Sequence, residues 1–112
     1  MHVCLILFLI TAMGELASRT QGGPVTASAR SATQLYSKNC ASCHGRDGRA
    51  NTLKAKRNHA RNISDPEWQE RVGDERIFNS IMNGKGKMPA YGKKLSEQEI
   101  DALVTYVRGL RK

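Results

Sequence analysis

Hydrophobic and polar residues follow the repeat of an α-helix along much of this chain, most clearly near its C-terminus. Apolar side chains recur there at three- and four-residue intervals: Ile100, Leu103, Val104, Val107 and Leu110. The preceding residues, Ser96 to Glu99, read Ser-Glu-Gln-Glu, a capping box that begins a helix. Arg111 and Lys112 at the end complement the helix dipole. The sequence therefore predicts a C-terminal amphipathic helix.

Two segments upstream carry the same kind of pattern. Residues 32–39 place Leu35 and Tyr36 on one apolar side, and residues 74–83 place two isoleucines four positions apart. Residues 45–48 read Gly-Arg-Asp-Gly, which is typical of a turn that ends the first segment. Both segments are predicted to be helices.

A further short helix is predicted to begin at Asp65. Aspartate is a favoured helix cap, and Pro66 suits the first helical position. Residues 46–61 before it are rich in Lys and Arg and show little periodicity, so we expect a polar, basic loop there. No alternating pattern typical of β-strands occurs in the sequence. The predicted fold class is all-α.

The first 29 residues differ in character from the rest. Residues 3–13 form an apolar run of the length of a signal-peptide core, too short for a membrane span of about 20 residues. No Lys or Arg precedes this run, and the better of two small-residue cleavage patterns lies at residues 27–29. We expect residues 1–29 to be a signal peptide and linker, residues 30–112 to be one domain, and the protein to be exported to the periplasm.

The chain of 112 residues is long enough for one small domain but lean in large apolar side chains, with two Phe and one Trp. A core of this size needs a disulfide, a metal or a bound cofactor as additional support. Three cysteines argue against a simple disulfide framework. Because Cys4 lies in the N-terminal apolar run, the informative pair is Cys40 and Cys43, which is followed directly by His44.

Cys40 to His44 read Cys-Ala-Ser-Cys-His, the C-x-x-C-H attachment signature of a c-type haem. Two cysteines three positions apart on a helical turn point the same way, so both sulfurs reach the vinyl groups on one side of a porphyrin. The next side chain, His44, then becomes the proximal ligand of the iron. We therefore expect one haem c per chain, attached through Cys40 and Cys43.

Two other interpretations of this motif remain. A redox-active dithiol requires a βαβ frame, of which the sequence shows no sign. A zinc site would recruit His59 beside the cysteines, but the adjacent Cys43 and His44 are poorly placed to bind one tetrahedral ion, and there is no second C-x-x-C.

Three motifs follow one another along residues 32–112: CASCHGRDG at 40–48, GKGKMPAYG at 84–92 and LSEQEIDALVTYVRGL at 95–110. With them the chain resembles class I cytochromes c, in particular the short bacterial forms similar to the cytochrome c6 group and to the haem domains of cbb3-type oxidase subunits. The resemblance implies a cytochrome c fold, with three to five helices wrapped around one covalently attached haem.

The family takes its sixth iron ligand from a methionine in a loop before the last helix, and Met88 matches that position. A glycine-rich loop can approach a flat ligand closely, and Pro89 stiffens it. Met82 is the first competitor, but it lies in phase with Phe78 on a predicted helix, where methionine usually fills the core. His59 is the second competitor and would give two imidazole ligands. The resemblance thus implies His44 and Met88 as the axial pair.

The resemblance also assigns structural roles. Tyr36 and Tyr106 match the aromatic residues through which the family packs its first and last helices. Trp68 resembles the aromatic residue near the haem propionates, although an ordinary half-buried tryptophan explains it equally well. The family often has a proline whose neighbouring carbonyl orients the proximal histidine, whereas residues 51–64 contain none. The hydrogen-bond partner of His44 is therefore left open.

The formal net charge is +8. Lys and Arg lie on both sides of Met88 and follow His44: Lys85, Lys87, Lys93 and Lys94, then Arg46, Arg49, Lys54, Lys56, Arg57 and Arg61. In a class I cytochrome both stretches lie near the haem edge. We therefore expect docking to acidic surfaces of redox partner proteins.

The predicted function is electron transfer between respiratory partners by a monomeric protein that is not an enzyme. Aromatic residues are too sparse for nucleic-acid binding, and membrane contact is expected only through a partner complex. The alternatives are a haem c redox or gas-sensing module in which Met88 leaves the iron, and a small subunit of a dehydrogenase or oxidase complex.

Overall fold

The computed structural model describes residues 30–112, so the predicted signal peptide and linker, including Cys4 and Met13, lie outside the described residues. The helices in chain order are α1 (Ala32–Asn39), α2 (Ala41–His44), α3 (Leu53–Asn58), α4 (Pro66–Arg71), α5 (Asp74–Asn83) and α6 (Glu97–Gly109). This part of the chain contains no β-strand, only an isolated bridge between Lys85 and Met88. The all-α prediction is confirmed. With the short helices α2 and α3, the described residues form six helices, one more than the three to five expected.

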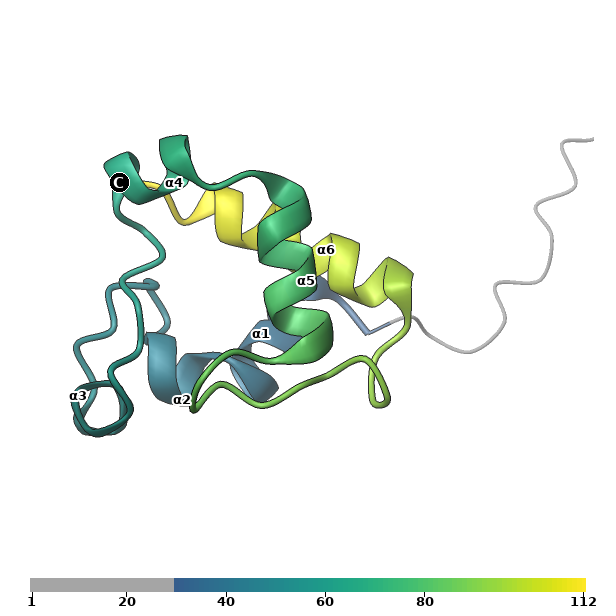
Figure 1. The fold of residues 1–112 in the computed structure, drawn as a ribbon, viewed down its shortest axis with the longest axis horizontal. Coiled ribbons are helices and arrows are strands. Elements are labelled where there is room, and N and C mark those ends of the chain that lie inside the picture. Colours follow the sequence, from purple (N-terminus) through teal and green to yellow (C-terminus); the bar gives the residue numbers. More distant parts are fainter. Residues whose placement is uncertain (1–29) are drawn as a thin grey trace, which may run out of the picture.

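The first and last helices pack against each other and form the main part of the core (Figure 1). The rings of Tyr36 on α1 and Tyr106 on α6 lie 4.7 Å apart between centroids, tilted by 34°. Leu35, Ile100 and Leu103 are almost completely buried in the same cluster. The predicted packing of an aromatic residue from each helix is confirmed. None of the helices within residues 30–112 combines the length and apolar character needed to cross a bilayer.

Capping side chains explain where the longer helices begin. Ser31 accepts a hydrogen bond from the Gln34 N–H and Ser96 from the Glu99 N–H, and in both cases the later side chain bonds back to the serine N–H. The Ser96 N–H, followed by the Arg30 guanidinium, holds the pKa of Glu99 below its usual value. The ion pair of Arg30 with Glu99 also ties the start of α1 to the start of α6.

The prediction of a loop throughout residues 46–61 is wrong, because residues 53–58 form α3. Thr52 caps this helix, accepting a hydrogen bond from the Ala55 N–H at 2.9 Å. Only Ala55 of the helix is buried, and Leu53 is 83% exposed. A helix that buries one small side chain leaves no apolar periodicity in the sequence, which is why the pattern missed it.

Arg108 links three elements at the C-terminal side of the fold. Its guanidinium donates to the Asp74 carboxylate at 2.7 Å, to the Gln69 carbonyl at 2.6 Å and to the Val72 carbonyl. Arg108 on α6 thus supplies hydrogen-bond donors to carbonyls at the end of α4. Its bond to Asp74 holds the start of α5 next to them.

A buried amide, Gln69, joins the loop before α4 to α6. Gln69 is 6% exposed, and its Nε2 donates to the carbonyls of Ile63 at 2.8 Å and Val107 at 2.7 Å. We expect Gln69→Leu to lower the free energy of unfolding by about 2–3 kcal/mol, because the Ile63 carbonyl loses its donor and the Val107 carbonyl keeps only the Leu110 N–H. Denaturant unfolding of the haem-loaded protein measures this. The exposed Gln98→Leu is the control, and a loss for Gln69→Leu no larger than that control would contradict the assignment.

Candidate haem site

The C-x-x-C-H motif lies at the corner between the first two helices. Cys40 ends α1 and precedes α2, and its carbonyl accepts hydrogen bonds from the N–H groups of Cys43 at 3.1 Å and His44 at 2.9 Å. Both cysteines are free thiols and partly buried. The buried hydroxyl of Tyr36 donates to the Gly45 carbonyl at 2.7 Å, which fixes the end of the turn against α1. The motif thus presents its side chains from a rigid helical turn.

The cysteine chemistry speaks against a redox-active dithiol. Burial, and then the charge of Cys43, raise the pKa of Cys40 to about 11. A thiol with this pKa stays protonated at neutral pH, whereas catalytic dithiols depend on a lowered pKa. Cys40 therefore does not provide a reactive thiolate.

The predicted zinc alternative is not supported either. Within residues 30–112, no three His, Cys, Asp or Glu side chains gather into a group able to hold a metal ion by themselves. His59 is exposed and ends α3 in the left-handed region with φ 54°. It caps a helix rather than joining the two cysteines.

The structure supplies the hydrogen-bond partner of His44 that the sequence left open. His44 Nδ1 lies 2.9 Å from the Arg61 carbonyl oxygen. Because a carbonyl only accepts, Nδ1 carries the proton and Nε2 is the nitrogen available to a metal. No sequence signal reveals this contact, since a backbone carbonyl is common to every residue.

Helix α3 fastens the C-x-x-C-H turn from outside. The Thr52 hydroxyl lies 3.1 Å from the carbonyl oxygens of both Ser42 and Cys43, which share its single O–H. The Asn58 side-chain amide donates a hydrogen bond to the sulfur of Cys43, with Nδ2 and Sγ 3.9 Å apart. Neither Thr52 nor Asn58 was identified from the sequence. The only available signal was that threonine is a favoured helix cap, which could have indicated Thr52.

The second predicted ligand, Met88, lies in a tight turn of residues 84–92, which we call the Met88 loop. Lys85 and Met88 exchange backbone hydrogen bonds of 3.0 and 2.9 Å. Gly84 has φ +73°, and a Cβ there would lie 2.7 Å from the Met88 carbonyl oxygen. Only glycine fits this position, so the turn depends on Gly84.

The competitor Met82 is occupied by packing. Its sulfur lies against the backbone of Gly92, which leaves no room for a Cβ at that glycine. The Gly92 N–H also donates to the Met82 carbonyl at 3.0 Å. Met82 and Met88 are both partly buried against the core cluster, and Met88 is the one of the two that lies in the loop before α6.

Tyr91 joins the Met88 loop to the cysteine turn. Its hydroxyl donates to the carbonyl of Asn39, the residue before Cys40, at 2.9 Å. Burial, followed by the charges of Cys40 and Cys43, raises the pKa of Tyr91. The sequence motif included Tyr91 without giving it a role, and the structure shows that it brings the two predicted ligand segments together.

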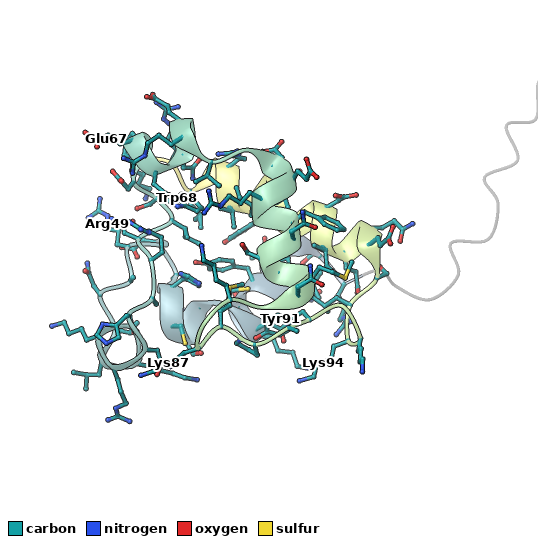
Figure 2. All side chains as sticks on the ribbon, in the orientation of Figure 1. Arg49, Glu67, Trp68, Lys87, Tyr91 and Lys94 are labelled. Atoms are coloured by element: carbon teal, nitrogen blue, oxygen red, sulfur yellow. The ribbon has the colours of Figure 1, made fainter. Side chains whose placement is uncertain are left out.

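Ten apolar side chains pack on the core cluster yet remain partly exposed: Cys40, Ala41, Trp68, Val72, Phe78, Met82, Met88, Tyr91, Tyr106 and Leu110. Trp68 comes from α4 and Tyr91 from the Met88 loop (Figure 2). Two free thiols, an imidazole nitrogen, a thioether and this apolar surface form a donor set suited to a large flat ligand with a metal centre. The residues present fit a covalently held haem.

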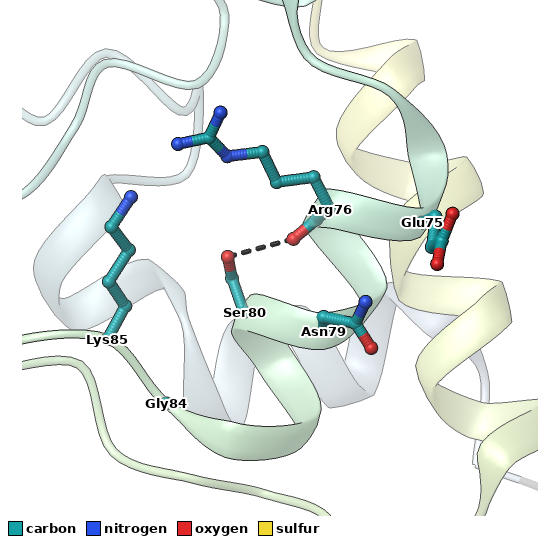
Figure 3. Close-up of a pocket in the computed structure, with 6 residues that line it drawn as sticks. All are labelled: Glu75, Arg76, Asn79, Ser80, Gly84 and Lys85. Atoms are coloured by element: carbon teal, nitrogen blue, oxygen red, sulfur yellow. Dashed lines mark hydrogen bonds between the residues drawn. The ribbon is translucent and has the colours of Figure 1, made fainter.

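A separate hollow of about 350 Å³ lies beside α5 and the start of the Met88 loop (Figure 3). The side chains of Arg76 and Lys85 extend to the same side of α5, and the Ser80 hydroxyl donates to the Arg76 carbonyl at 2.8 Å. Its lining is polar and charged, unlike the apolar surface around Cys40. Two of the side chains that line this hollow, Arg76 and Lys85, place positive charge beside the Met88 loop.

A helical domain with crossing terminal helices, C-x-x-C-H at the first corner and a methionine loop before the last helix has the architecture of a class I c-type cytochrome. Residues 27–107 match the family described as cytochrome c oxidase, cbb3-type, subunit III. The chain belongs to this family and thus to the class I c-type cytochromes. Membership implies a covalently bound haem c and a role in electron transfer.

Individual relatives agree with this assignment. The cbb3-type cytochrome c oxidase subunit FixP of Azorhizobium caulinodans is 35% identical over 76% of this chain, which spans 28% of FixP. Cytochrome c6 of Gloeothece citriformis is 37% identical, with 67% of this chain and 64% of that protein covered. The solved structure of the c-type cytochrome KustC0563 is 38% identical with a TM-score of 0.69, over 74% of this chain and all of that one.

Proposed function

We propose that this protein carries single electrons through one haem c attached to Cys40 and Cys43, with His44 and Met88 as axial ligands. The observation that carries the proposal is the His44 to Arg61 hydrogen bond, which directs Nε2 away from the backbone on the same turn as two free thiols. The bound haem supplies an iron that alternates between the ferric and ferrous states.

Backbone groups of the chain hold the two proposed ligands in one geometry. The Arg61 carbonyl orients His44, and the Lys85 to Met88 turn holds the thioether. Trp68 is partly buried, and its indole N–H has no hydrogen-bond partner within residues 30–112. That N–H is suited to donate to a haem propionate. Little rearrangement is needed when an electron enters or leaves, which favours an electron carrier over an enzyme.

An absorption spectrum of the purified, reduced protein tests the proposal. Sharp low-spin haem c bands without carbon monoxide binding are the expected result, because both axial positions are occupied. A high-spin spectrum with ready carbon monoxide binding would instead favour the gas-sensing alternative. A colourless protein would contradict both functions.

The charge distribution supports the proposed partner. The exposed Lys and Arg of residues 46–61 and 85–94, which we call the basic rim, number ten against a single acidic residue, Asp47. The rest of residues 30–112 holds seven basic and eight acidic residues. Figure 2 shows Arg49, Lys87 and Lys94 among the rim residues. A one-sided positive surface beside the haem-binding turn suits an acidic patch on a redox protein.

Neutralising part of the basic rim should slow electron transfer to an anion. We expect Lys56→Gln with Lys93→Gln to lower the rate of oxidation by hexacyanoferrate about threefold at low ionic strength, and the difference to vanish as salt screens the charges. Stopped-flow absorbance measures the rate.

The matched control removes the same charge elsewhere, with Arg71→Gln and Lys112→Gln on exposed residues outside the rim. The control should keep the wild-type rate. Equal slowing in both double variants would show that only net charge matters and would contradict a docking role for the rim.

We also propose that residues 1–29 direct export, and that the mature monomer works in the periplasm between respiratory partners. The apolar run at residues 3–13 supports export. The similarity to FixP, an oxidase subunit by name, supports a respiratory setting. N-terminal sequencing of the mature protein tests the boundary, and a mature chain that retains residues 1–29 would contradict it.

A further inference from the structure

The loop that links α3 to α4 holds the partner of His44. We call residues 61–64 the Arg61 loop. Its Arg61 carbonyl accepts from His44 Nδ1 at 2.9 Å, and its Ile63 N–H donates to the Gly48 carbonyl at 2.8 Å. The loop is therefore bonded to His44 on one side of Asn62 and to Gly48, four residues further along the chain from His44, on the other.

One side chain within the Arg61 loop determines its conformation. Asn62 Oδ1 accepts hydrogen bonds from the Ser64 N–H at 3.0 Å and from the Ser64 hydroxyl at 2.8 Å. Ser64 is 3% exposed, whereas Asn62 is exposed. The bonds therefore tie the backbone around Asn62 to a buried residue, although the asparagine itself fills no space in the core.

On the basis of the proposed haem site, we propose that Asn62 is a positioning residue for the proximal ligand His44. The Arg61 carbonyl belongs to the planar peptide group that ends at the Asn62 nitrogen, so the φ angle of Asn62 sets where that carbonyl points. The two bonds to Ser64 close a ring that begins at the Asn62 Cα, so they hold this Cα, to which the peptide group is attached, in place relative to the buried Ser64 and keep the Arg61 carbonyl against His44 Nδ1.

The consequence is electronic as well as structural. A firm Nδ1 hydrogen bond makes the imidazole a stronger donor through Nε2. A stronger donor favours ferric over ferrous iron, so loss of the Asn62 bonds raises the reduction potential. A purely structural role would change stability without changing the potential.

Asn62→Ala in the haem-loaded, full-length protein tests this role. We expect the His44 Nδ1 proton to exchange with solvent about fivefold faster, as measured by NMR of the reduced protein, because about one net hydrogen bond is lost. The reduction potential, measured by voltammetry, is expected to rise in the same sample.

Two rescue variants separate positioning from packing. Asn62→Asp keeps the acceptor oxygen. Asn62→Pro restricts φ without it, and the Asn62 N–H has no acceptor within residues 30–112 that this change would leave unpaired. Both variants are expected to return exchange and potential toward wild-type values. Asn79→Ala on α5, an exposed asparagine without a side-chain hydrogen bond in the described chain, is the matched control and should change neither quantity.

Wild-type exchange and potential in a folded Asn62→Ala protein would overturn the proposal. So would Asp and Pro variants that exchange as fast as the alanine variant. A preparation without a haem spectrum would contradict the proposed function itself, which keeps the two failures distinct.

Discussion

Replacing Cys40 and Cys43 together by serine is expected to give a polypeptide that carries no covalent haem and is largely unfolded. Ten apolar side chains, Cys40 and Met88 among them, pack on a small core but remain partly exposed, so we expect the chain alone to bury too little surface to support its six helices. A bound haem stabilises the folded state by binding it and not the unfolded chain. Haem staining after denaturing electrophoresis measures covalent haem, and far-ultraviolet circular dichroism measures helix content.

Ser42→Ala is the control for the cysteine replacement, because Ser42 lies between the two cysteines and is exposed. This variant should retain haem and helix content. A serine double variant that folds stably without haem would contradict the view that haem completes the interior.

Met88→Leu is expected to abolish the charge-transfer band of a ferric iron–methionine bond, to lower the reduction potential and to let the ferrous protein bind carbon monoxide. Leucine keeps the volume of methionine but offers no sulfur. Methionine opposite histidine raises the potential, so its loss lowers it. Absorption spectroscopy of both oxidation states and voltammetry check these outcomes.

The same substitution at Met82 provides a matched control. Met82 packs its sulfur against Gly92, so Met82→Leu should keep the band and the potential with at most a modest loss of stability. If Met82→Leu removed the band while Met88→Leu retained it, Met82 would be the iron ligand and the assignment of Met88 would be contradicted.

Sequence patterns predicted those parts of the fold that bury an apolar face or carry a cap. The helices α1 and α5 begin and end where the pattern placed them, and α6 begins after Ser96 as its capping box indicated. The Tyr36 and Tyr106 contact followed from resemblance and is confirmed by the ring geometry. The helix limits depend on side-chain types at short spacings, which a single sequence displays, whereas the Tyr36 and Tyr106 contact came from the family resemblance.

The parts that escaped prediction depend on backbone groups or on isolated polar residues. Helix α3 buries only Ala55, so it lacks the periodicity that would reveal it. The His44 partner is the Arg61 carbonyl, which has no sequence signature. Gln69 bridges residues far apart in the chain, and nothing local marks it as buried. Haem attachment at Cys40 and Cys43 and ligation by His44 and Met88 remain predictions.

The most direct test of the account is the intact mass of the purified, mature protein, measured with and without prior treatment by an alkylating reagent under denaturing conditions. We predict the mass of the polypeptide plus one haem, with neither Cys40 nor Cys43 modified by the reagent. A mass equal to the polypeptide alone, with both of these thiols alkylated, would contradict the account.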